Sequence, residues 1–224
     1  MRPIEKRPQP VLTGSQAARS EAENLLGEFS ALLRQVGLPV GGITSCGTFS
    51  SPAATESRSS ETFLKDYLEQ VLLPLELPAI AEACGHAARG EIRELLLQDQ
   101  RLAAPLLQTP FAGPSQQVGR RQLMRMRPLR DDRLVQRYLK AVESGQAYGW
   151  HTLVYGVTLA VYSVPLRQGL LFYGQETLAG LAGAATDETM APGLSRVLDN
   201  LTEQVFVAVA ASLASVEPRA SVVE

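Results

Sequence analysis

Residues 131–145 read DDRLVQRYLKAVESG, and this stretch decides the fold class. Asp131 and Asp132 stand where an aspartate can accept a hydrogen bond from a free backbone N–H and cap a helix. Gly145 stands where a helix commonly ends. Between them, apolar side chains recur three and four residues apart, at Leu134, Val135, Tyr138, Leu139 and Val142. That spacing marks one face of an α-helix, so the stretch predicts a helix that buries one side.

The same period recurs on both sides of this stretch. Residues 20–37 combine the capping-box spacing of Ser20 and Glu23 with an apolar face and a closing Gly37. Residues 153–164 (LVYGVTLAVYSV) would also suit a strand by propensity, but no partner strand is evident, so we expect a helix buried on most faces. Further helical patterns cover 62–72, 79–88, 92–107, 115–125 and 194–216, with kinks or breaks near Pro74, Pro78, Pro105 and Pro110. The sequence therefore predicts an all-α protein, a compact bundle of roughly eight to ten helices.

The expected organisation is one helical domain over residues 16–216. Residues 1–15 hold three prolines and no periodicity, which predicts a disordered tail, and residues 217–224 are expected to form a flexible one. Residues 38–60 are rich in Ser, Thr and Gly. They predict a long loop, and such loops are usually functional or mobile.

Composition narrows the functional class. Of 224 residues 45% are hydrophobic and 20% are charged, as in ordinary globular proteins. The net charge of −2 gives no global attraction to nucleic acid or to an anionic membrane, so neither is expected as a partner. Two cysteines and two histidines are too few for a disulfide framework or a zinc cluster, which fits a reducing cytoplasm. The start lacks the apolar segment of a secretory signal, and the apolar run 150–166 is shorter than a membrane span.

No catalytic motif is evident in the sequence. It contains no G-x-S-x-G turn, no phosphate-binding loop and no dinucleotide fingerprint. Cys84 and His86 stand two residues apart, so their side chains diverge on a helix, and structural roles are favoured over metal binding. His151 precedes an apolar run and is expected to be a partly buried, hydrogen-bonded histidine rather than a base. We therefore expect a protein that is not an enzyme and acts by holding other proteins, with no catalytic residue and no metal ligand.

Charge is distributed unevenly along the chain. Residues 120–140 carry eight basic side chains against two acidic ones, a balance of +6, whereas the chain from residue 141 onward carries three basic and eight acidic ones, a balance of −5. A solvated helix face would explain the basic stretch. A sharper interpretation is a docking surface for an acidic protein, or for a nucleotide held by a partner. Nucleic acid is weakly indicated, because Tyr138 is the only aromatic residue within the stretch.

Several short motifs follow one another in a recognisable order. They are Leu38-Pro39-Val40-Gly41-Gly42, the helix at 62–72 with Leu77-Pro78-Ala79, Ser115-x-x-x-Gly119-Arg120-Arg121-Gln122-Leu123, and Gly145-x-x-x-x-x-His151-x-x-x-Tyr155-Gly156. In this order and spacing the chain resembles the UreF-type urease accessory proteins, over about residues 20–205.

This resemblance implies both a fold and a role. UreF proteins are all-α, form homodimers in the cytoplasm and bind UreH (also called UreD) and the GTPase UreG. The complex delivers nickel to the urease apoprotein, so no tightly bound cofactor is expected here, and nickel is handled by the complex. The implied partner-binding residues are Leu38, Pro39, Gly41, Gly42, Ser115, Gly119, Arg120, Arg121, His151, Tyr155 and Gly156. Gly156 would also allow close helix–helix packing, and Tyr155 and Trp150 would be core or dimer anchors.

Two segments depart from the family pattern, which leaves alternatives open. Residues 43–49 (ITSCGTF) lack the His and Glu of F-[AS]-H-S-x-G-L-E, and residues 184–190 (AATDETM) lack the basic residue and the Gly-Gln pair of A-A-x-[RK]-L-x-P-L-G-Q, which becomes Gly193-Leu194. One alternative is therefore a diverged UreF-like scaffold that serves another assembly. An enzyme would use His151 as base with a Ser or Thr of residues 44–60, but nothing in the sequence orients that base.

Overall fold

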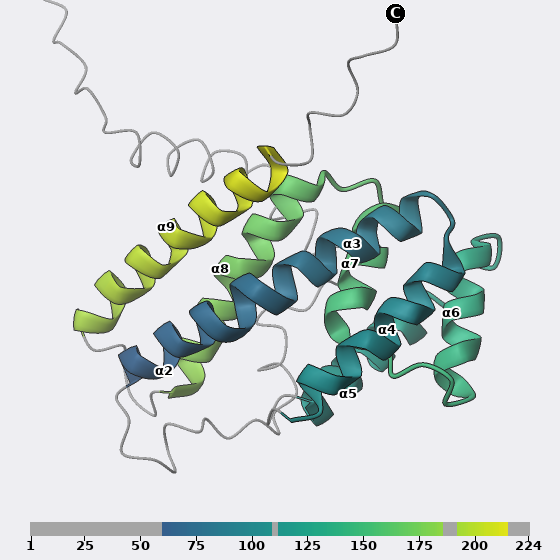
Figure 1. Cartoon of the computed structure of the whole chain (residues 1–224), viewed down its shortest axis with the longest axis horizontal. Helices are drawn as coiled ribbons and strands as arrows, with labels where there is room; N and C mark the ends of the chain where they lie inside the picture. The colour runs from purple at the N-terminus through teal and green to yellow at the C-terminus, as the bar shows by residue number, and fades with distance from the viewer. Residues whose placement is uncertain (1–59, 109–111, 186–191, 215–224) are drawn as a thin grey trace, which may run out of the picture.

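The computed structural model of the chain describes residues 60–108, 112–185 and 192–214, and the elements in these ranges are all helical. In chain order they are α2 (Ser60–Tyr67), the π-helical segment η3 (Leu68–Glu76), α3 (Leu77–Ala88), α4 (Ile92–Leu106), α5 (Ala112–Arg125), α6 (Arg133–Glu143), α7 (His151–Val161), α8 (Leu166–Ala185) and α9 (Pro192–Ala214) (Figure 1). The predicted all-α class is confirmed. Residues 153–164, which also suited a strand, form helix as far as Val161.

Some expectations concern residues outside these ranges. They include the helix at 20–37, the altered segment 43–49, most of 184–190, and the loop predicted at 38–60 except for Ser60, which begins α2. The tails at 1–15 and 217–224 also lie outside them, so the division into one domain and two tails stays a prediction.

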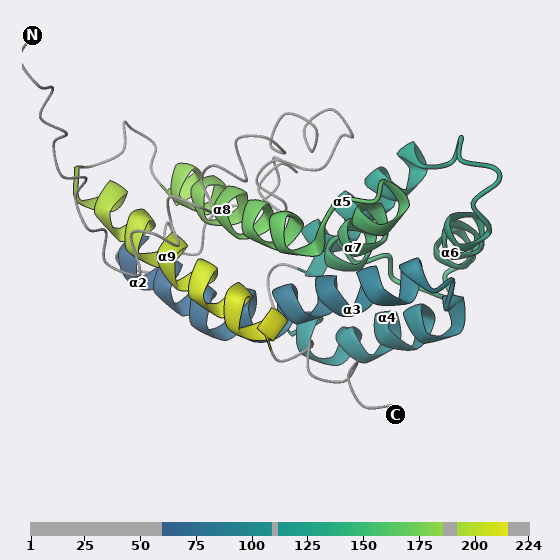
Figure 2. The same ribbon diagram turned by 90° about the horizontal axis from the view of Figure 1, so that it is seen from above.

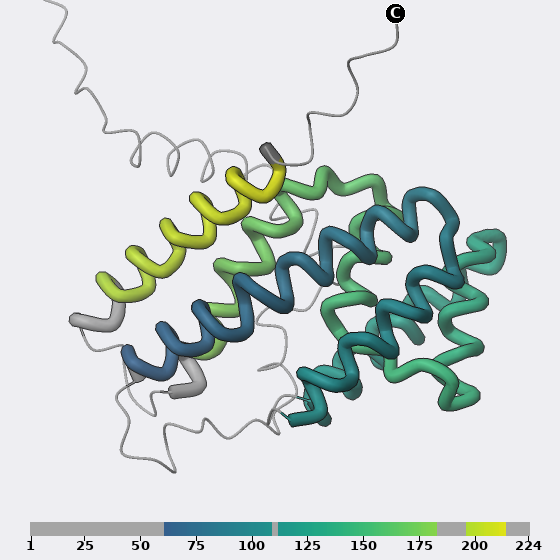
Figure 3. Tube along the Cα trace, viewed as in Figure 1, coloured from purple at the N-terminus to yellow at the C-terminus, as the bar shows by residue number. Residues whose placement is uncertain are grey.

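The first three elements join into one rod, which Figure 3 shows as a continuous tube. The kink predicted between Pro74 and Pro78 does not interrupt it. Pro78 lies in the first turn of α3, directly after η3. Pro74 lies inside η3, where the N–H of Leu77 bonds to the carbonyl of Leu72, five residues back. This wider π-helical turn accommodates a proline that would disrupt an α-helix.

Part of this rod, Glu61–Ala88, is long and apolar enough to cross a membrane by length and composition alone. In the structure it packs along α7, α8 and α9. A soluble protein's core helix meets the same criteria, and Glu76 is buried at the middle of the rod among hydrogen-bond partners.

Buried side chains form two clusters, and α7 contributes to both. Figure 2 shows the ribbon of α7 between those of α8 and α6. The α8–α9 core gathers apolar residues of α8 and α9 with those of the rod, whereas the α4–α6 core gathers those of α4, α5 and α6 with the end of the rod. Tyr155 and Leu159 of α7 belong to the first cluster, and Leu153 and Val157 belong to the second. Every residue from 151 to 159 is buried, as expected from its apolar composition.

Helix α6 forms as its capping residues predict. Asp132 Oδ1 accepts a hydrogen bond from the N–H of Val135 at 3.0 Å, and Gly145 just beyond the helix has a φ of +76°. Helix α4 is continuous from Ile92 to Leu106, so the break predicted near Pro105 coincides with its last turn. Both helices pack apolar faces into the α4–α6 core.

Candidate functional site

Helix α5 lies against α7 on a face made of small and apolar side chains. Gly119 is the closest point: a Cβ there would lie 2.0 Å from the carbonyl oxygen of Gly149 and 2.8 Å from the nitrogen of His151. Only glycine allows the two backbones to approach this closely. The buried face of α5 is thereby fixed against residues 149–151, and its opposite face is left to solvent.

The loop that α5 rests on is held by a buried carboxylate, Asp99 of α4. Its Oδ1 accepts a hydrogen bond from the N–H of Tyr148 at 2.6 Å, and its Oδ2 accepts from the N–H of Gly149 at 3.0 Å and from the hydroxyl of Tyr138 at 2.7 Å. The indole N–H of Trp150 donates to the Asp99 carbonyl at 2.9 Å. Burial raises the pKa of Asp99, and these hydrogen bonds oppose that shift. Three of these bonds, from Tyr148, Gly149 and Trp150, fix the segment that leads into α7, and the fourth ties Asp99 to α6.

Beneath α5, five buried polar side chains form one hydrogen-bonded chain across five elements. Ser115 Oγ lies 2.7 Å from His151 Nδ1, and His151 Nε2 lies 2.6 Å from the Tyr173 hydroxyl. The hydroxyls of Tyr173 and Tyr67 both donate to Glu76 Oε2, at 3.0 and 2.8 Å. Each of the five residues is at most 3% exposed. We call this set the buried polar chain.

The order of donors in the buried polar chain defines the tautomer of His151. Because the Tyr173 hydroxyl donates to Glu76, it accepts from His151 Nε2–H, and Nδ1 is left to accept from Ser115. Burial lowers the pKa of His151 to about 3, so the ring is neutral near pH 7. Burial raises the pKa of Glu76 to about 7, although the bonds from Tyr67 and Tyr173 pull it down. The 3.8 Å approach of His151 Nε2 to Glu76 Oε1 is therefore not an ion pair.

Along the hydrogen bonds, Ser115, His151 and Glu76 follow one another as serine, histidine and acid do in a hydrolytic triad. The buried polar chain nevertheless lacks an accessible nucleophile and an effective base. Ser115 is 1% exposed, so no substrate reaches its hydroxyl. A histidine whose pKa lies near 3 is a weak base near neutral pH. The buried polar chain is a structural device that ties α5, α7 and α8 to the rod.

The outward face of α5 carries the exposed part of the site. A shallow groove of about 440 Å³ runs along it, lined by Gly113, Gln116, Gln117, Arg120, Arg121 and Met124. These positions follow one helical stripe. Arg120 and Arg121 are exposed, and neither makes an ion pair or hydrogen bond with any other described residue. We call this stripe the α5 groove.

The structure separates the predicted partner-binding residues into two groups. Arg120 and Arg121 lie in the α5 groove. Ser115, Gly119, His151, Tyr155 and Gly156 are buried within the single chain, so they cannot touch a partner unless the chain rearranges. Leu38, Pro39, Gly41 and Gly42 lie outside the described residues.

Two of the buried residues have clear packing partners. The Tyr155 hydroxyl donates to the carbonyl of Gly169 at 2.8 Å. A Cβ at Gly156 would lie 2.5 Å from the Ile80 carbonyl oxygen and 2.9 Å from Ala83 Cβ. The close helix–helix packing expected at Gly156 is therefore present, between α7 and α3.

The basic stretch 120–140 also divides between two surfaces. Arg133, Arg137 and Lys140 are exposed on α6 at the spacing of a single stripe, whereas Arg127 pairs with Glu143. Of the eight basic side chains, only Arg120 and Arg121 line the α5 groove.

Sequence reasoning missed the buried acids. Neither Glu76 nor Asp99 was predicted to be buried, since their partners lie as far as 97 and 50 residues away. A faint signal existed: Glu76 stands between leucines in LPLELP, and Asp99 lies on the apolar side of α4.

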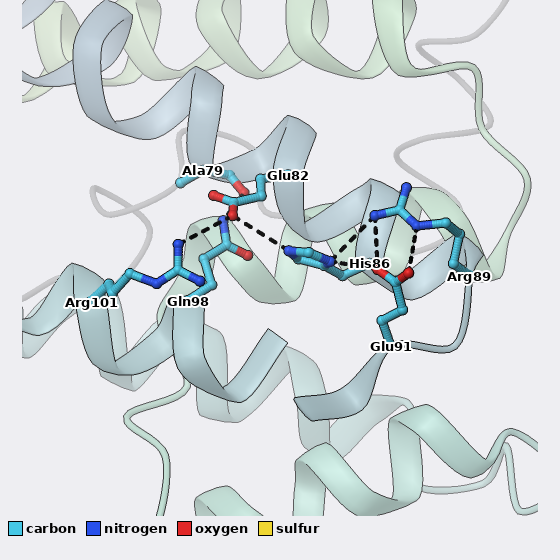
Figure 4. Close-up of polar contacts among 7 residues, drawn as sticks. All are labelled: Ala79, Glu82, His86, Arg89, Glu91, Gln98 and Arg101. Atoms are coloured by element: carbon cyan, nitrogen blue, oxygen red, sulfur yellow. Dashed lines mark hydrogen bonds and ion pairs between the residues drawn. The ribbon is translucent and has the colours of Figure 1, made fainter. Parts of the chain in front are cut away.

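Cys84 and His86 do not form a metal site in the structure. His86 Nδ1 lies 2.8 Å from Glu91 Oε2, and Nε2 lies 3.4 Å from Glu82 Oε1, in a cluster that joins α3 to α4 (Figure 4). Arg89 and Arg101 complete this cluster. Within the described ranges no group of three or more His, Cys, Asp or Glu side chains is arranged to hold a metal ion.

Comparison with known proteins agrees with this architecture. A family model described as UreF matches residues 54–186, which is more than half of the chain and spans α2 to α8. No curated protein and no solved structure matches the chain. The chain belongs to the UreF family.

Proposed function

We propose that this chain serves as the UreF-type scaffold of a nickel-insertion complex, in which it binds UreH (UreD), UreG and the urease apoprotein. Membership of the family carries the role of a urease accessory protein without catalytic activity of its own. The proposal has three further parts. The chain couples the GTP state of UreG to nickel transfer, it forms a homodimer, and it acts in the cytoplasm. Nickel is the cargo of the complex, and no tightly bound cofactor is assigned to the chain.

The observation that carries the proposal is the α5 groove. Arg120 and Arg121 are exposed, unpaired within the described residues, and mounted on a helix that Gly119 fixes against its neighbour. A charge that only contacts water does not need to lie on a rigid helix, whereas a binding surface gains affinity when its backbone is already held in place. A second open hollow, of about 570 Å³ on α9, is lined in part by Val207, which is 61% exposed. It offers an apolar surface for a second copy or another subunit.

Co-expression with UreH (UreD) and UreG, followed by size-exclusion chromatography, tests the proposal. We expect co-elution with the unchanged chain and its loss with Arg121→Glu, because a carboxylate would repel an acidic partner. Arg137→Glu on α6 is the matched control, since it makes the same charge change on an exposed residue outside the groove. Co-elution of Arg121→Glu at the unchanged level would show that the groove is not the partner surface.

A diverged scaffold remains the second candidate, favoured by the altered segments 43–49 and 184–190. In that case the chain would fail to bind UreG while it kept the UreF fold. Location of its gene outside any cluster that encodes urease subunits would favour this candidate, and location inside one would argue against it.

A further inference from the structure

The α5 groove combines three kinds of side chain along one stripe. Arg120 and Arg121 supply two guanidinium groups, Gln116 and Gln117 supply two amides, and Met124 supplies an apolar end that is 54% exposed. Helix α5 itself carries no acidic residue. The groove therefore has cationic, hydrogen-bonding and apolar parts in a fixed order.

The two arginines determine the charge of the ligand. A guanidinium group binds carboxylates through paired N–H donors, and neither Arg120 nor Arg121 has an acidic partner within the described ranges. An exposed unpaired arginine needs no partner for stability, so both remain available to a ligand. The ligand is thus expected to present at least two carboxylates.

The remaining lining residues distinguish a protein segment from a free anion. Met124 lies one turn beyond Arg120 and Arg121, and an exposed methionine side chain adapts readily to an apolar partner. Gln116 and Gln117 can both donate and accept hydrogen bonds, as a polypeptide requires. A phosphate ion would bind the two guanidinium groups and make no apolar contact with Met124.

The length of the groove limits what fits. Positions 113 to 124 span about 17 Å at roughly 1.5 Å per residue. This matches about three turns of a partner helix. The groove backbone is held in place by Gly119 and, through residues 148–150, by Asp99, so little ordering is needed on binding.

We propose that the α5 groove binds an acidic helical segment of a partner protein, with two or more carboxylates on Arg120 and Arg121 and an apolar side chain on Met124. This inference rests on the proposed function only in that the partner belongs to the nickel-insertion complex. The groove selects its partner by charge at Arg120 and Arg121 and by apolar contact one turn further on, at Met124.

Three designed helical peptides test this selectivity on the full chain by fluorescence anisotropy. The first places glutamates and one leucine on one face, the second replaces the glutamates with lysines, and the third replaces the leucine with alanine. We expect only the first to bind well, with binding weakened as NaCl rises from about 50 to about 300 mM. Arg120→Gln with Arg121→Gln should weaken it at least about tenfold, since two charged contacts are lost. Met124→Ala should weaken it by roughly threefold or more.

Arg133→Gln with Arg137→Gln on α6 is the matched double control and should bind the first peptide unchanged. Equal binding of the glutamate and lysine peptides, or no effect of the Arg120 and Arg121 changes, would overturn the inference. Full displacement by inorganic phosphate together with no effect of Met124→Ala would show a simple anion site and would also overturn it.

A photo-crosslinker at Gln117 provides the second measurement, in the complex assembled from purified proteins. We expect the crosslinked partner peptide to be acidic, and a neutral or basic one would contradict the inference. The two failures are separable. If Arg121→Glu abolishes the complex but the peptides are not discriminated, this inference fails and the proposed function stands. If the peptides are discriminated but the unchanged chain does not co-elute with UreH (UreD) and UreG, the proposed function fails and the selectivity of the groove for an acidic helix stands.

Discussion

Gly156 shows how much of this fold depends on a missing side chain. Its α-carbon faces the Ile80 carbonyl oxygen of the rod, and a methyl group there would lie at 2.5 Å. We predict that Gly156→Ala forces α7 and α3 apart and lowers the free energy of unfolding by about 1–3 kcal/mol. Urea unfolding measures it. Gly113→Ala is the matched control, because nothing lies within 4 Å of the added methyl group and the helix gains from alanine. An equal loss in both variants would contradict the steric explanation.

Glu76 gives a prediction about pH at the residue scale. Its pKa is about 7 in the folded chain against 4.5 as the ordinary value, so the folded state holds the proton more tightly. The stability that this provides is complete below about pH 4.5 and is lost as pH rises through about 7. Glu76→Gln stays neutral and escapes this loss. Relative to the unchanged chain, its free energy of unfolding should therefore rise by roughly 2–3 kcal/mol between pH 5 and pH 8.

The lowered pKa of His151 makes stability depend on pH in the opposite direction, but this dependence is the same in the unchanged chain and in Glu76→Gln. Its pKa is about 3, below the ordinary 6.5, so its contribution to stability is present above about pH 6.5 and is lost toward pH 3. The unchanged chain and Glu76→Gln have the same His151 contribution, so it does not affect the difference between their free energies of unfolding. Glu69→Gln, on the exposed side of the same segment, is the control and should show no such difference between the two pH values. A pH-independent effect of Glu76→Gln would mean that Glu76 ionises freely in the fold.

Local sequence could predict the environment of some residues but not of others. The exposed arginines 120 and 121 were identified by charge and motif position, because a surface residue needs no knowledge of its neighbours. His151 was expected to be bonded, but its partners Ser115 and Tyr173 come from helices 36 and 22 residues away. No local pattern contains such distances, so the buried polar chain could not be predicted.

At the scale of elements, α6 was the most predictable helix, and its cap can be tested. Asp132 accepts from the N–H of Val135, one of the donors that the start of a helix leaves unpaired. We predict that Asp132→Ala costs about 1 kcal/mol and lowers the melting temperature. Asp131→Ala is the matched control, since Asp131 is exposed and makes no capping bond. The same loss in both variants would indicate a general charge effect rather than a cap.

The rod was the least predictable element. Its two prolines suggested a kink between separate helices, because prolines usually disrupt an α-helix. The π-helical segment around Pro74 contacts α9, which follows much later in the chain, from Pro192. Local sequence rules describe α-helical turns, so they could not anticipate this local change of register.

At the scale of the whole molecule, the two cores are joined by α7 and by the end of the rod. The sequence revealed that residues 153–161 are apolar all round, which correctly indicated a helix buried on most faces. It could not show that this helix contributes to two clusters, since that depends on which other helices, before and after it in the chain, cover each side. The buried polar chain crosses between them at the start of α7.

Because α7 packs apolar side chains into both cores, a fragment that ends or begins at α7 leaves one of its apolar faces uncovered. A fragment that ends after α7 keeps the α4–α6 core but exposes Tyr155 and Leu159, and a fragment that begins at α7 exposes Leu153 and Val157 instead. Either piece would carry an uncovered apolar surface prone to aggregation. We predict that limited proteolysis of the native protein trims it without yielding a soluble half, as mass spectrometry of soluble fragments can show. A stable fragment that ends or begins at α7 would contradict this. Shortened versions of the protein made to study the α5 groove should therefore retain α8 and α9.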